Sequence, residues 1–99
     1  MAGPIYVVFF AKWKEPYYKL TKEEQDKLGE QGEAALKQVG GEHIITCMSS
    51  WANEQWLGWG VEKYPDIEAV QKHAMALYDL NWFNYIDSIT YLGTEMPQA

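Results

Sequence analysis

The sequence has a single cysteine, only two histidines and few basic residues. With Cys47 alone, no disulfide can form within the chain. Eight Lys and Arg against fourteen Asp and Glu leave a net charge of −6 and a pI of about 4.7. Phosphate backbones and anionic membrane surfaces both repel such a chain. We therefore expect neither a nucleic acid nor a membrane as a partner.

Long apolar runs and familiar catalytic motifs are also missing. The longest early apolar run, Ile5 to Ala11, is too short to cross a bilayer, and no basic segment of a signal peptide precedes it. We expect a cytoplasmic protein. The sequence has no GxGxxG, P-loop, GxSxG or HExxH motif. Two histidines without a clustered acidic pair do not make a metal site, so we expect no metal and no cofactor.

Large apolar side chains, by contrast, are abundant. The chain is 47% hydrophobic and 15% aromatic, with five Trp and seven Tyr among 99 residues. A chain of this length forms one domain, which we assign to residues 1–99, and its core is small. The surplus of aromatic residues predicts a second buried surface, most simply the interface of a homodimer.

The first half of the chain shows a strand followed by a helix. Residues Ile5–Trp13 are apolar on both alternating sides, which is typical of a strand covered on both faces. Thr21 and Glu24 match a capping box, and the helix that they begin runs to about Val39, before Gly40-Gly41.

The second half predicts two strands, a helix and a last strand. The strands His43–Trp51 and Gln55–Lys63 are separated by three residues, which indicates an antiparallel hairpin. Asp66 is a good N-cap for a helix that runs to Leu80, and the last strand spans Phe83–Leu92.

This order, β-α-β-β-α-β, predicts a ferredoxin-like α+β fold. Right-handed crossovers give a four-stranded antiparallel sheet with two helices on one face. The other face is then bare. Because the first strand is apolar on both sides, we expect a second copy to cover it, as in a dimeric α+β barrel.

One histidine lies beside the apolar face of the second helix. At ~100° per residue, a single face gathers Ile67, Val70, Ala74, Leu77 and Tyr78, which predicts that Leu77 is buried. His73 lies on the shoulder of this arc. An imidazole with a pKa near ~6.5 suits a general base, so His73 is the candidate catalytic residue. We expect His43 to be structural or solvated.

Small residues indicate where a ligand pocket would lie. Gly58 and Gly60 share one side of the third strand, and Gly32 and Ala35 lie on the core face of the first helix. Such residues permit either close packing or room for a ligand. The candidate ligand-binding residues are Phe9, Trp56, Trp59, Leu77, Tyr78, Tyr85 and Tyr91. The alternative is that these aromatic residues fill the core and the dimer interface.

The whole pattern from Ile5 to Gly93 resembles the dimeric α+β barrel superfamily. That group includes antibiotic-biosynthesis-monooxygenase-like proteins, stress-responsive barrel proteins and polyketide cyclases similar to olivetolic acid cyclase. Residues 16–24, PYYKLTKEE, and 82–87, WFNYID, look like small uncharacterised families of darcynin type. The resemblance implies a pocket between sheet and helices for apolar or aromatic molecules with a few oxygens. In the cyclase-like members a histidine on or near the second helix is the base, and His73 matches it.

Three functions follow. The first is binding of an apolar, oxygenated small molecule, fatty-acid-like or aromatic. The second is a cofactor-independent cyclase, isomerase or monooxygenase in which His73 removes a proton and tyrosine hydroxyls stabilise the resulting anion. The third is a dimeric stress or scaffold protein whose cavity its own side chains fill. The identity of the ligand is not encoded in any motif.

Overall fold

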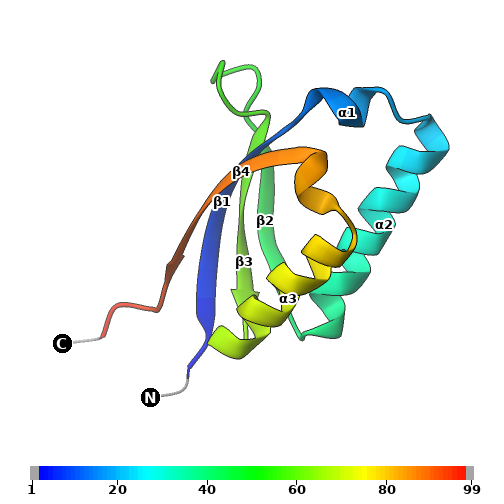
Figure 1. The fold of residues 1–99 in the computed structure, drawn as a ribbon. Coiled ribbons are helices and arrows are strands. Elements are labelled where there is room, and N and C mark those ends of the chain that lie inside the picture. The colour runs from blue at the N-terminus through cyan, green and yellow to red at the C-terminus, as the bar shows by residue number, and fades with distance from the viewer. Residues whose placement is uncertain (1–2, 98–99) are drawn as a thin grey trace.

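A four-stranded antiparallel sheet of order β2-β3-β1-β4 organises the computed structural model, which describes residues 3–97. The strands are β1 (Ile5–Trp13), β2 (Glu42–Met48), β3 (Gly58–Tyr64) and β4 (Ile86–Gly93). The two long helices, α2 (Lys22–Gln38) and α3 (Ile67–Asp79), lie on the same side of the sheet (Figure 1). The predicted ferredoxin-like α+β arrangement is therefore confirmed.

The starts of both long helices are fixed by the side chains that the sequence indicated. Thr21 Oγ1 accepts a hydrogen bond from the Glu24 amide at 3.1 Å, and Glu24 Oε1 accepts one from the Thr21 amide at 2.9 Å. Asp66 Oδ1 accepts from the Ala69 amide at 2.8 Å at the start of α3. These bonds satisfy amides that have no partner within the helix.

The hairpin between β2 and β3 differs from the prediction. Its connection spans residues 49–57 rather than three residues. Asn53 Oδ1 accepts from the amides of Gln55 at 2.8 Å and Trp56 at 3.0 Å, and the Ser49 amide donates to Leu57 O at 2.9 Å. An asparagine that bonds to nearby amides competes with strand pairing, so a looped end replaces the short turn.

Two other segments are more helical than expected. The residues after β1 form a short helix, α1 (Glu15–Tyr18), with Pro16 in its first turn, where proline costs no hydrogen bond. After α3, Asn81 adopts a left-handed conformation with φ 58° and is followed by the 3-10 turn η1 (Trp82–Asn84). The last strand therefore begins at Ile86 instead of Phe83.

Strand β2 contains a bulge. His43 pairs with Glu62 and Ile45 pairs with Val61, so two steps along β2 match one step along β3 and Ile44 is the extra residue. An extra residue in one strand shifts its side-chain alternation. As a result, His43 and Thr46 both lie on the side of the sheet that faces the helices.

The packed core occupies one end of the space between sheet and helices. Val7, Leu36, Tyr64 and Ala69 form its buried cluster, and Leu36 and Tyr64 are each only 2% exposed. They come from β1, α2, β3 and α3 respectively. Val7, Leu36 and Tyr64 also line a cavity between the sheet and the helices.

No described element covers the opposite, outer face of the sheet (Figure 1). Register places Val8, Phe10, Val61, Trp59, Ile89 and Tyr91 on it. Ile89 is 41% exposed and Tyr91 62% exposed, and even Val8 and Phe10 on the central strand β1 are not buried. A contiguous apolar face of this kind is typical of an interaction surface.

Helix α3 is rotated relative to the expected phase. Ile67 and Tyr78, expected on the apolar face, are 49% and 65% exposed. Leu77, expected to be buried, is only partly buried. The face that turns toward the sheet carries Ala69, Val70, His73, Ala74 and Leu77. His73 therefore lies on this face rather than on its shoulder. The hydrogen bond to Tyr64 on β3 compensates its burial.

Candidate functional site

A cavity of about 660 Å³ lies between the sheet and its two long helices. Its wall is mostly apolar and comes from every strand and from both helices. The apolar lining includes Phe9, Trp13, Leu36, Val70, Leu77, Trp82, Phe83 and Ile86. A volume in this range suits a small organic molecule, and the apolar wall suits hydrocarbon or aromatic surface.

The glycines next to this cavity are used for packing. A Cβ on Gly60 would lie 2.7 Å from the Phe9 ring and 2.8 Å from Ile45 O. A Cβ on Gly32 would lie 2.9 Å from the Trp82 ring. Close packing, the first of the two alternatives for these residues, therefore explains them: the expected trough along β3 is filled by Phe9, and the ring of Trp82 lies against α2.

A chain of polar side chains crosses one side of the cavity. The Tyr64 hydroxyl oxygen lies 2.8 Å from His73 Nδ1 and 2.8 Å from Glu62 Oε1. Glu62 Oε2 lies 3.5 Å from His43 Nδ1, and His43 Nε2 lies 3.0 Å from Glu33 Oε2. The chain thus connects His73 on α3, through β3 and β2, to Glu33 on α2. It joins the cavity to the exposed surface of α2.

Burial shifts the protonation equilibria of the three inner groups. The pKa of Glu62 is raised, mainly because burial disfavours its carboxylate, although the hydrogen bond from Tyr64 and the nearby His43 oppose the shift. The pKa of His73 is lowered, mainly by burial and secondarily by His43. The pKa of Tyr64 is raised far above its ordinary value by burial and by Glu62. His73 is therefore held neutral, and Tyr64 keeps its proton.

The structure places some of the predicted site residues on the cavity. His73, Phe9 and Leu77 line it directly. Trp59 also lines it, between Gly58 and Gly60, although strand alternation directs its ring toward the outer face beside Phe10.

The other predicted residues lie elsewhere. Trp56 packs against Phe10, with ring centroids 6.4 Å apart. Tyr78 is 65% exposed, and Tyr91 is 62% exposed on the outer face. Tyr85 follows η1 and does not line the cavity. Tyr78 points away because α3 is rotated, and Tyr91 lies on the outer side of β4. Trp56 lies in the loop that replaces the start of the third strand.

The series of polar side chains that continues from His73 was not predicted, although the pattern of β3 in the sequence indicates it. Glu62 and Tyr64 continue the row of Gly58 and Gly60 at intervals of two, so they face the same side of β3. A carboxylate and a phenol on the helix-facing side of a central strand need polar partners. His43, expected to be structural or solvated, is one of them.

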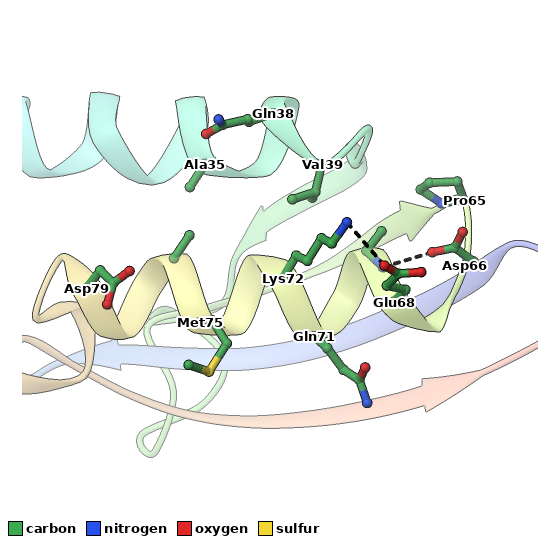
Figure 2. Close-up of a pocket in the computed structure, with 12 residues that line it drawn as sticks. Ala35, Gln38, Val39, Pro65, Asp66, Glu68, Gln71, Lys72, Met75 and Asp79 are labelled. Atoms are coloured by element: carbon green, nitrogen blue, oxygen red, sulfur yellow. Dashed lines mark hydrogen bonds and ion pairs between the residues drawn. The ribbon is translucent and has the colours of Figure 1, made fainter.

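A second hollow, of about 680 Å³, lies between α2 and α3 (Figure 2). Ala35 and Val39 point from α2 toward α3 in this view. Its rim is charged, and Lys72 pairs with Glu68 at 3.2 Å. The other charged residues of this hollow, Asp66 and Asp79, are exposed. The inner cavity, which has a buried polar side, is therefore the candidate site.

Across residues 3–97, no three His, Cys, Asp or Glu side chains converge in an arrangement that would hold a metal ion. Among the helices described in that range, none is sufficiently long and apolar to cross a membrane.

Solved structures share this fold at low sequence identity. The RPA0582 protein of Rhodopseudomonas palustris, of unknown function, matches with a TM-score of 0.65, 15% identity, and coverage of 99% of this chain and 86% of that one. Its methylated form gives a TM-score of 0.66, 14% identity and coverage of 98% and 84%. The solution structure of a hypothetical Arabidopsis thaliana protein gives a TM-score of 0.58 at 13% identity. The match covers 97% of this chain and 93% of that one. No protein-family model and no curated protein matches the sequence. At these identities the likeness shows the fold alone.

Proposed function

We propose that the protein binds an apolar, oxygenated small molecule in the cavity between sheet and helices. The observation that carries this proposal is the combination of an apolar wall with one polar side, formed by Glu62, Tyr64 and His73. Such a cavity offers burial to a hydrocarbon or aromatic body and a hydrogen-bond partner to its oxygen. The volume between sheet and helices favours binding over a scaffold whose cavity its own side chains fill.

Replacing His73 by alanine tests the polar side of the cavity. His73→Ala should weaken binding of an alkylphenol by about 1–3 kcal/mol, the usual cost of removing one hydrogen bond from a dry site. Tryptophan fluorescence can follow the titration because Trp13 and Trp82 line the cavity.

The matched control is Lys72→Ala, one residue earlier on α3 and exposed. It should bind the probe as the unsubstituted protein does. Equal affinities for the unsubstituted protein and His73→Ala would rule out a role of His73 in binding. If no alkylphenol, fatty acid or aryl ketone binds at all, the proposed function fails.

A second candidate is a cofactor-independent enzyme in which His73 is the general base. It is favoured by the hydrogen bond between His73 and Tyr64, since a base needs a partner that orients its ring.

The enzyme candidate predicts a specific pH dependence. Only neutral imidazole accepts a proton, and burial lowers the pKa of His73. Proton abstraction should therefore rise with pH, with its midpoint below ~6.5, the ordinary value for histidine. Deuterium incorporation beside the carbonyl of an aryl alkyl ketone, followed by NMR in heavy water, measures this. A profile that rises only well above neutral pH, or one that His73→Ala leaves unchanged, would exclude His73 as the base.

We further propose that the chain belongs with the dimeric α+β barrels and forms a cytoplasmic homodimer through the outer face of its sheet. Support comes from the exposed apolar residues on that face, among them Ile45, Ile89 and Tyr91. A second copy suits this surface because sheet faces of the same chain have the same shape and the same apolar character.

A further inference from the structure

Tyr64 has one hydroxyl proton and two neighbours that can accept it. Glu62 Oε1 and His73 Nδ1 each lie 2.8 Å from its oxygen, which is hydrogen-bond distance for both. A phenol donates one hydrogen bond and accepts others. Tyr64 therefore donates to one neighbour and accepts from the other, so the three groups have two possible arrangements.

The proton on Glu62 selects between these arrangements. An ionised Glu62 only accepts, so Tyr64 donates to it, and His73 donates from Nδ1 to the Tyr64 oxygen. Neutral His73 then has no proton on Nε2. A protonated Glu62 donates to the Tyr64 oxygen instead, and Tyr64 donates to Nδ1. Neutral His73 then carries its proton on Nε2.

We propose that Glu62 is the positioning residue that sets the tautomer of His73, and with it the class of ligand that the cavity accepts. With Glu62 ionised, Nε2 is an acceptor and suits a ligand hydroxyl, such as that of a phenol. With Glu62 protonated, Nε2–H is a donor and suits a ligand carbonyl. The ligand preference rests on the proposed binding function, whereas the tautomer assignment does not.

The same geometry lets Glu62 be the final acceptor of a proton taken from a ligand. One proton enters at Nε2, the Nδ1 proton moves to the Tyr64 oxygen, and the hydroxyl proton of Tyr64 moves to Glu62 Oε1. One proton is gained and the negative charge on Glu62 disappears. His73 starts and ends neutral, which suits an imidazole whose charged form is disfavoured by burial.

The groups around Glu62 are few and come from four elements. His43 on β2 lies 3.5 Å from Oε2, and Glu33 on α2 lies 3.0 Å from the other ring nitrogen of His43. Tyr64 is the hydrogen-bond partner on β3, and Val7, the register partner on β1, is apolar and buried. A protonated His43 stabilises the ionised form of Glu62, whereas burial and Glu33 favour the protonated form.

Nitrogen NMR of the free protein tests the tautomer assignment without any ligand. The chain has only two histidines, so its ¹⁵N-labelled imidazoles give two separable patterns, which His43→Asn assigns. At high pH we expect His73 to be the Nδ1–H tautomer. As the pH falls, it should convert to the Nε2–H tautomer. An Nε2–H tautomer of His73 at high pH would overturn the proposal.

Glu62→Gln should abolish this conversion, because an amide does not gain a proton over this range. The matched control, Glu68→Gln on the exposed side of α3, should leave it intact. An unchanged conversion in Glu62→Gln would overturn the proposal. If Glu62→Gln fails to fold, Tyr64→Phe gives the second test, because without the hydroxyl the tautomer of His73 should no longer follow Glu62.

Ligand preference supplies the second readout. Lowering the pH should change the ratio of the dissociation constants of an alkylphenol and of an aryl ketone of equal size by about tenfold in favour of the ketone, the effect of gaining and losing one hydrogen bond. A ratio that does not change with pH, while both probes bind, contradicts the ligand assignment alone. Absence of binding by both contradicts the proposed function and leaves the tautomer result standing.

Discussion

Replacing Ile89 by aspartate should convert the proposed dimer to a monomer. Ile89 pairs with Phe10 on the outer face and is 41% exposed in the single chain, so one chain tolerates a polar side chain there. In the proposed dimer, the same carboxylate would be buried against an apolar sheet without a partner. Interface residues of this kind change the free energy of association by about 2–4 kcal/mol, which is roughly 30- to 1,000-fold in the dissociation constant.

Sedimentation equilibrium measures this directly. The unsubstituted protein should have twice the 11.4 kDa chain mass at micromolar concentration, and Ile89→Asp should approach the chain mass itself. Met75→Asp is the control, because Met75 is 63% exposed on α3, on the other side of the sheet. It adds the same charge and should leave the mass unchanged. A monomeric unsubstituted protein, or a variant that stays dimeric, would refute assembly through the outer face.

The second large effect concerns stability. Leu36→Ala should lower the free energy of unfolding by about 2–5 kcal/mol, the range for removing a buried leucine side chain. Leu36 is 2% exposed and packs with Val7, Tyr64 and Ala69. A Cβ added at Gly41 would collide with it, which shows how closely the chain surrounds this residue.

Leu57→Ala is the matched control, since Leu57 is 39% exposed and its loss should cost less than ~1 kcal/mol. Urea unfolding at a fixed protein concentration compares the two variants, because the stability of a dimer depends on concentration. Leu77→Ala should fall between them, because Leu77 lines the cavity and is only partly buried. Equal losses from Leu36→Ala and Leu57→Ala would contradict the placement of the core.

The fold was predictable because its determinants are local. The capping box at Thr21, the N-cap at Asp66 and the run in β1 that is apolar on both sides each act over a few residues. The element order then permits few topologies. The short hairpin turn was predicted wrongly because side-chain bonds from Asn53 depend on a loop geometry that spacing does not reveal.

The site was only partly predictable because it depends on long-range compensation. Apolar periodicity alone predicts that Ile67 and Tyr78 face the sheet, whereas in the structure His73 faces it. It does so because Tyr64, nine residues earlier, offers a hydrogen bond. Periodicity treats a histidine as polar wherever it occurs. A buried hydrogen-bond partner reverses that preference. Tyr64 comes within reach of His73 only when α3 packs on β3.

The bulge at Ile44 has a consequence for any comparison or redesign of this protein. Because of one additional residue, every side chain of β2 after it lies on the opposite side from the one that regular alternation from His43 would give. An alignment that matches β2 to a regular strand would assign Thr46 to the outer face and Ile45 to the cavity. Deleting Ile44 would remove the bulge and keep the sides of the strand: Ile45 would follow His43 on the outer face, and Thr46 would still face the cavity. The bulge therefore lets His43 and Thr46, which lie an odd number of positions apart, face the cavity together.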